Sequence, residues 1–293
     1  MHLSRTTLCQ CRGYTLRGKT LVMRKLIASL IFGTLLFAGC ARHQAQPAES
    51  RPFESTEAMR TLFGNFDPII KASLYRVPQG AVKDPNFADK DEIRARPFFT
   101  QETSENGIPK YYMLTWAKPA GQPFDCRGCA PLISAAVFVS GTNGWQLESV
   151  SRAALVFGDF GKPPAAELVQ LGPDRHALLL RVTTSRAQTM TQEALLVPWK
   201  GGVQDAFQII AADNNEDDCG GSYPCFGYRR DLRFVPGSNP SYDDIVLTLS
   251  GKDMAMKRPY DLHTVKGTER LRFRNGKYVE IEKTGQTVMA EKQ

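Results

Sequence analysis

The feature that most restricts the fold is a long series of short, strand-like runs that fills the chain from Lys110 to its end. The runs are rich in aliphatic and aromatic residues, and Gly, Pro or Asn separates them. They are residues 111–116, 133–139, 145–150, 177–182, 194–197, 207–210, 232–235, 245–249, 270–274 and 278–281. Short runs with this punctuation are typical of antiparallel β structure. We predict a mainly β fold of antiparallel sheets, sandwich or barrel-like, with a short N-terminal helical region and with an α+β fold as the alternative.

Two Asn-Gly pairs, Asn143-Gly144 and Asn275-Gly276, lie between such runs and predict tight hairpins, because both residue types tolerate positive φ. In the second hairpin, Leu271 and Phe273 fall on one face. The other face and the next strand carry charges, namely Arg270, Arg272, Arg274, Lys277, Glu280 and Glu282. We expect a solvated outer face with cross-strand charge pairs. A cationic patch for lipopolysaccharide or a partner protein is the alternative.

The part before Lys110 is predicted to be helical and irregular over residues 55–109, followed by a β-rich domain over residues 110–293. A short helix is expected from a capping Ser55 to Gly64, because apolar residues recur between them at three- and four-residue spacing. Residues 79–109 are dense in Pro, Asp, Glu and Asn and predict a long irregular connection, where a domain boundary is possible. The chain is long enough for one large domain or two small ones.

The start of the chain has the layout of an export signal. Met23-Arg24-Lys25 precedes the uncharged residues 26–39, and Cys40 follows. Fourteen residues of helix span about 21 Å, less than the ~30 Å of a bilayer core, so a cleaved signal is favoured over a permanent membrane helix. Residues 1–22 fit no signal peptide, and we predict that translation starts at Met23 and that residues 1–22 are an extension.

The end of this signal, Leu36-Phe37-Ala38-Gly39-Cys40, resembles the lipobox of bacterial lipoproteins. The resemblance implies that Cys40 receives a diacylglyceryl group and, with palmitate among its acyl chains, becomes the first residue. In that family Asp after the Cys retains the protein at the inner membrane. Ala41 stands there, which implies a lipid anchor in the outer membrane, facing the periplasm. Residues 40–54 then read as the lipidated Cys and a flexible spacer. An ordinary cleaved signal is the alternative.

Charge and motifs exclude nucleic acid and nucleotide partners. Six of the 37 basic residues and none of the 30 acidic residues precede Cys40, so the remainder of the chain is close to neutral. A phosphate-neutralising surface needs a surplus of Lys and Arg on the folded part. Residues 13–20 (GYTLRGKT) match the phosphate-loop pattern, but polar residues precede them and the export signal follows. We interpret this match as a coincidence.

Four further cysteines, Cys126, Cys129, Cys219 and Cys225, make an even number in an oxidising compartment and predict two disulfides. Three pairings are possible, and proximity favours Cys126 with Cys129 and Cys219 with Cys225. A redox pair at Cys126 and Cys129 and a four-Cys metal site are the alternatives.

Candidate metal and catalytic residues are few. Asp213, Asn215 and Asp217 have the alternating spacing of calcium ligands, but the loop lacks its turn Gly, so they are only a weak calcium candidate. Hydrolase signatures are absent, and His176, beside a Pro-Asp turn, is expected to be a surface residue. The sequence predicts no cofactor and nominates no catalytic residue.

These observations favour a non-enzymatic binding or inhibitory module that meets another envelope protein, one version being an immunity protein against a periplasmic toxic effector. The stretch 126–139 also resembles uncharacterised proteobacterial envelope proteins. The alternatives are a thiol-disulfide oxidoreductase using Cys126 and Cys129 and a structural component of envelope machinery.

Overall fold

The computed structural model describes residues 52–88, 90, 92–185, 188–216, 219–220, 224–254 and 262–289. The predicted leader, the predicted start at Met23, the predicted lipidation site Cys40 and the calcium candidate Asp217 lie outside these residues. In the described part, one helix precedes thirteen strands. They are α1 (Ser55–Phe63), β1 (Ser73–Tyr75), β2 (Ile93–Glu105), β3 (Ile108–Pro119), β4 (Leu132–Gly141), β5 (Gly144–Val156), β6 (Ala165–Gly172), β7 (Arg175–Ser185), β8 (Thr189–Trp199), β9 (Gly202–Asn214), β10 (Gly227–Val235), β11 (Asp244–Met254), β12 (Leu262–Arg274) and β13 (Lys277–Met289).

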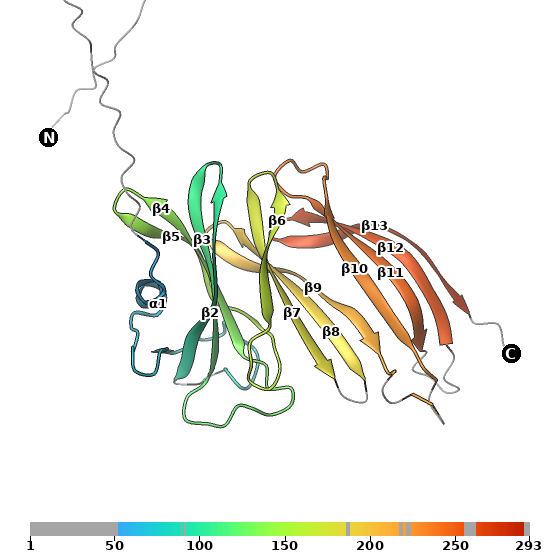
Figure 1. Ribbon diagram of the computed structural model, residues 1–293, viewed down its shortest axis with the longest axis horizontal. Coiled ribbons are helices and arrows are strands. Elements are labelled where there is room, and N and C mark those ends of the chain that lie inside the picture. The colour runs from blue at the N-terminus through green and yellow to red at the C-terminus, as the bar shows by residue number, and fades with distance from the viewer. Residues whose placement is uncertain are drawn as a thin grey trace, which may run out of the picture. The chain divides into compact units, whose positions relative to one another are not determined.

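The strands form two antiparallel sheets in which neighbours in space are neighbours in sequence. The first sheet has the order β1-β2-β3-β4-β5, and the second runs β13-β12-β11-β10-β9-β8-β7-β6 (Figure 1). The prediction of a mainly β fold of antiparallel sheets with one short N-terminal helix is therefore confirmed. No helix among the described residues has the length and apolar character needed to cross a membrane.

Each predicted run lies inside a strand, but the expectation of an irregular connection over residues 79–109 is wrong from Ile93 onward, where β2 begins. Ile93 and Ala95 alternate inward and are fully buried, and the second half of β2 is mostly polar and partly exposed. The register with β3 shifts between Pro97 and Phe99. Apolar alternation thus lasts too few residues to mark the strand in the sequence. Strand β6 is also absent from the predicted runs.

The turns follow the Asn-Gly signals with one correction. Asn275 and Gly276 have φ of 50° and 87° and join β12 to β13, which confirms the second predicted hairpin. The first hairpin also exists, but its last pair is Gly141 with Gly144, so the turn falls on residues 142–143, one residue earlier than expected. A third pair, Asn106-Gly107, joins β2 to β3 with φ of 52° and 75°.

Helix α1 ends as predicted, because Gly64 adopts a φ of 79° and its N–H donates to the Arg60 carbonyl at 2.8 Å. The expected Ser55 cap is wrong, since Glu54 holds the N-cap position and makes no side-chain capping bond. The buried face of α1 carries Ala58, Met59 and Leu62, which pack in the first of three hydrophobic cores.

The three hydrophobic cores hold the helix and the sheets together as layers. The first core joins α1 and its loops to one face of β1–β5, and the second joins the opposite face of that sheet to β7 and β8. The third lies within the second sheet, between β7–β9 and β11–β13, where the Trp199 and Phe273 ring centroids are 5.2 Å apart. β10 pairs with β9 only at its first residues, which lets the second sheet bend around this core. Trp116, Trp145 and Trp199 pack at the rims of the cores.

The charged face of β12 differs from the solvated face that we expected. Arg270 and Arg272 bind Asp244 at the start of β11, with nitrogen–oxygen distances of 2.8 and 3.0 Å. Asp244 is fully buried. The hydrogen bond from Arg272 is the main cause that lowers the pKa of Asp244. Burial acts in the opposite direction, and the hydrogen bond from Arg270 lowers the pKa further. These arginines therefore neutralise a buried carboxylate. In β13, Glu282 is the register partner of Arg270, and Glu280 is the register partner of Leu271.

Candidate functional site

A cavity of about 270 Å³ lies where the first sheet meets the second. Its walls come from the β2–β3 hairpin, from β5, from the β6–β7 and β8–β9 turns and from the loop before β11. The lining residues are Glu105, Lys110, Tyr112, Glu148, Ser149, Arg175, His176, Pro198, Trp199, Lys200, Gly201 and Tyr242. We call it the junction cavity.

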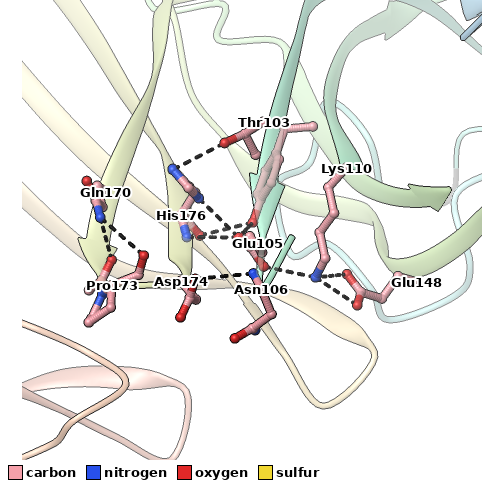
Figure 2. Close-up of polar contacts among 11 residues, drawn as sticks. Thr103, Glu105, Asn106, Lys110, Glu148, Gln170, Pro173, Asp174 and His176 are labelled. Atoms are coloured by element: carbon pink, nitrogen blue, oxygen red, sulfur yellow. Dashed lines mark hydrogen bonds and ion pairs between the residues drawn. The ribbon is translucent and has the colours of Figure 1, made fainter. Parts of the chain in front are cut away.

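Glu105 organises the inner wall, and its side chain is only 2% exposed. Its Oε1 atom accepts hydrogen bonds from the Tyr112 hydroxyl at 2.6 Å and from the backbone N–H of His176 at 3.0 Å. Its Oε2 atom lies 2.9 Å from the Lys110 ammonium. Figure 2 shows how the end of β2 carries this carboxylate to the first residues of β7. A buried carboxylate with this many donors is a fixed anchor between the two sheets.

Lys110 joins Glu105 to the outer carboxylate of Glu148, whose oxygens lie 2.9 and 2.8 Å from Nζ. Burial raises the pKa of Glu105, but the bonds from Tyr112, Lys110 and His176 outweigh it and hold this pKa below its ordinary value. Burial lowers the pKa of Lys110, and its two carboxylate partners more than reverse this effect. Burial, assisted by the Glu105 bond, strongly raises the pKa of Tyr112. All three groups thus keep one protonation state near neutral pH.

His176 is not the surface residue that we expected, because its side chain is only 17% exposed and joins this network. Its Nδ1 atom lies 3.2 Å from Glu105 Oε1, and its Nε2 atom lies 3.3 Å from the Thr103 hydroxyl. A proton on Nδ1 satisfies both contacts, with Nε2 accepting from Thr103. The Asn106 N–H also donates to Asp174 at 3.2 Å, which ties the β2–β3 turn to the β6–β7 turn (Figure 2).

The outer wall combines two cations with two aromatic rings. The Arg175 guanidinium lies 6.0 Å from the Tyr242 ring centroid, and the Lys200 ammonium lies 5.4 Å from that of Trp199. Lys200 and Gly201 form the β8–β9 turn with φ of 50° and 77°, which places this ammonium beside the cavity. Within the described ranges, neither cation has a salt bridge to a carboxylate. The wall therefore offers positive charge over aromatic faces, a combination that suits a ligand with an acidic group.

The residues singled out in the sequence lie elsewhere. Cys126 and Cys129 pair in the β3–β4 loop, with Cα atoms 5.2 Å apart, and Cys219 and Cys225 pair between β9 and β10 at 4.8 Å. The pairing favoured by proximity is therefore the one in the structure. Cys129 is 6% exposed and is followed by strand β4 rather than by a helix whose N-terminus lowers a thiol pKa.

The two calcium candidates that the structure describes, Asp213 and Asn215, are held by hydrogen bonds of their own. Asp213 accepts from the Gln188 amide at 2.5 Å. The Asn215 amide donates to the Pro224 carbonyl at 3.0 Å and its oxygen accepts the Phe226 N–H at 2.7 Å, so it closes the disulfide loop. In the part of the chain that the structure describes, no three His, Cys, Asp or Glu residues gather as metal ligands.

Comparison with protein-family models, with curated proteins and with solved structures finds no match to this chain. The junction cavity is therefore interpreted from its own geometry.

Proposed function

We propose that this protein is a lipid-anchored, non-enzymatic binding module of the bacterial envelope, and that it engages an acidic group of a partner protein in the junction cavity. The observation that carries the proposal is the difference between the charges of the inner wall and those of the outer wall. The carboxylates and the ammonium of the inner wall pair with one another. Arg175 and Lys200 of the outer wall face the cavity beside Trp199 and Tyr242. A binding site of this kind needs fixed walls and a few convergent polar groups.

The protonation states also support binding over catalysis. A general acid or base works best when its pKa lies near the operating pH and it can reach the substrate. Glu105 has a lowered pKa, Tyr112 a strongly raised one, and each is bonded to the other in a buried position. Both groups therefore serve better as supports for the cavity wall than as proton carriers.

The envelope location rests on the sequence around Cys40, whose resemblance to a lipobox motivates the anchor. Metabolic labelling with palmitate, followed by purification of the chain and of a Cys40→Ala variant, tests this part. We expect label on the parent chain and none on the variant. An unlabelled parent chain in the cytosolic fraction would contradict the anchor and leave the binding activity to be tested by itself.

The binding activity is tested by capture from detergent-solubilised envelopes with three baits: the parent chain, Lys200→Glu at the cavity, and Lys252→Glu at an exposed position of β11. We expect one protein that is enriched by the parent and by the β11 variant and lost with Lys200→Glu. A partner that depends equally on both lysines, or on neither, would contradict the assignment to the junction cavity. If the partner is a toxic effector, co-expression of this protein with the effector should also protect cells. That result would support the narrower proposal, in which the protein is an immunity protein.

A further inference from the structure

A second cationic surface lies on the first sheet, away from the residues that line the junction cavity. Arg94 and Arg96 project from β2 on the face opposite Ile93 and Ala95, which are fully buried in the first core. Their direct neighbours on β3 are Lys118 and Trp116, in the pairs Arg94 with Lys118 and Arg96 with Trp116. The Lys118 ammonium lies 5.9 Å from the Trp116 ring centroid. We call these four residues the β2–β3 basic patch.

The charge arrangement of this patch works against stability. Like charges directly opposite each other on antiparallel strands repel, and Arg94 faces Lys118 in this way. Among the described residues, none of the three cations has a salt bridge to a carboxylate. The Nε atoms of Arg94 and Arg96 are also buried without a hydrogen-bond partner. Local arrangements that cost stability without internal compensation are typical of functional surfaces.

From this arrangement we propose that the β2–β3 basic patch binds an extended acidic polypeptide segment. Side chains two residues apart on a strand repeat at about 6.6 Å, both in β2 and in an extended ligand. Two alternate carboxylates of such a ligand can therefore each meet one guanidinium, and Arg pairs with carboxylates through two parallel N–H donors. The Lys118 ammonium, near the Trp116 ring that packs at the rim of the second core, extends the contact beyond the two arginines.

The half-burial of the patch favours a polypeptide over a membrane surface. All four residues are intermediate in exposure, and none belongs to the exposed class. A flat bilayer needs side chains that protrude, whereas a single extended chain can reach cations that lie within a sheet face. The proposal does not depend on the junction cavity, so the two can fail separately.

The test uses the purified full chain and a fluorescent ten-residue peptide with Glu at alternate positions separated by Thr. The variant Arg94→Gln/Arg96→Gln removes two of the three patch charges and leaves Lys118. Arg233→Gln/Arg274→Gln removes the same charge from exposed positions of β10 and β12. Far-UV circular dichroism and thermal unfolding establish that both variants fold. Fluorescence anisotropy at low salt then measures binding, and a peptide with Gln in place of Glu serves as the uncharged probe.

We expect the parent and the control variant to bind the acidic peptide alike, the patch variant to bind it about tenfold more weakly, and added salt to weaken the binding. The Gln peptide should not bind. Equal affinities for the two variants, or no binding to the parent, would overturn the proposal. Binding of the parent to phosphatidylglycerol vesicles but not to the peptide would also overturn it, in favour of a lipid surface.

Discussion

Replacing Glu105 by Gln tests whether the inner wall of the junction cavity is held by charge. The substitution keeps the size of the side chain but turns one oxygen into an amide that donates. Because Oε1 accepts from Tyr112 and His176 and Oε2 meets Lys110, either orientation of the amide places a donor against a donor. The variant also leaves Lys110, 7% exposed in its side chain, with Glu148 as its remaining partner.

Removing one member of a buried ion pair usually costs about 3–5 kcal/mol. Since Glu148 still compensates Lys110, we place the loss for Glu105→Gln near the lower end, at about 3 kcal/mol of unfolding free energy. For a domain of this size that corresponds to a fall in Tm of roughly 6–12 °C. Chemical denaturation followed by tryptophan fluorescence measures the free energy, and differential scanning calorimetry measures Tm.

The matched control is Glu102→Gln on the same strand, where an exposed carboxylate accepts one bond from the Tyr111 hydroxyl. That change should cost less than about 0.5 kcal/mol. A double-mutant cycle of Glu105→Gln with Lys110→Gln should give a coupling energy of about 2 kcal/mol. A loss below about 1 kcal/mol for Glu105→Gln, or one equal to the control, would refute the view that this carboxylate holds the two sheets together.

Three further predictions follow from the same contacts. Because the folded-state pKa of Glu105 is lowered, its stabilisation is present above its unfolded pKa and is lost as pH falls through the folded pKa, so urea titrations on the acid side should show a shallower pH slope for Glu105→Gln than for the parent. Asp244→Asn leaves two arginines facing a neutral, buried amide and should lower the unfolding free energy by about 3 kcal/mol; an unchanged denaturation midpoint would contradict this. Gly161→Ala should cost clearly more than Gly80→Ala in thermal unfolding, because both have positive φ but only the first Cβ would strike backbone, that of the loop beside the Cys126–Cys129 pair; equal costs would refute the steric argument.

Local patterns in the sequence predict the β architecture well. Each apolar run over residues 110–281 became part of a strand because burial of alternate or continuous apolar side chains drives strand pairing. β2 escaped prediction because its buried apolar residues are confined to its start, while the rest is held by pairing with β3 and by the network of the buried Glu105 at its end. The Asn106-Gly107 pair was the available sign of that hairpin.

The junction cavity could not be predicted in the same way. Glu105 and His176 are separated by 71 residues and meet only because the first sheet packs on β7 and β8. Each residue alone has an ordinary local context: a charged residue before a turn, and a histidine after one. The local disulfide pairs, by contrast, followed from proximity along the chain.

In-cell photo-crosslinking at the junction cavity tests the proposed binding function most directly. A photoreactive amino acid in place of Pro198, which lines the cavity next to Trp199, leaves Arg175 and Lys200 intact, and the same group at position 233 serves as a control on the exposed face of β10. The proposal predicts one discrete protein adduct from position 198 that is absent from position 233. The same adducts from both positions, or none from position 198 in cells that display the full chain, would contradict it.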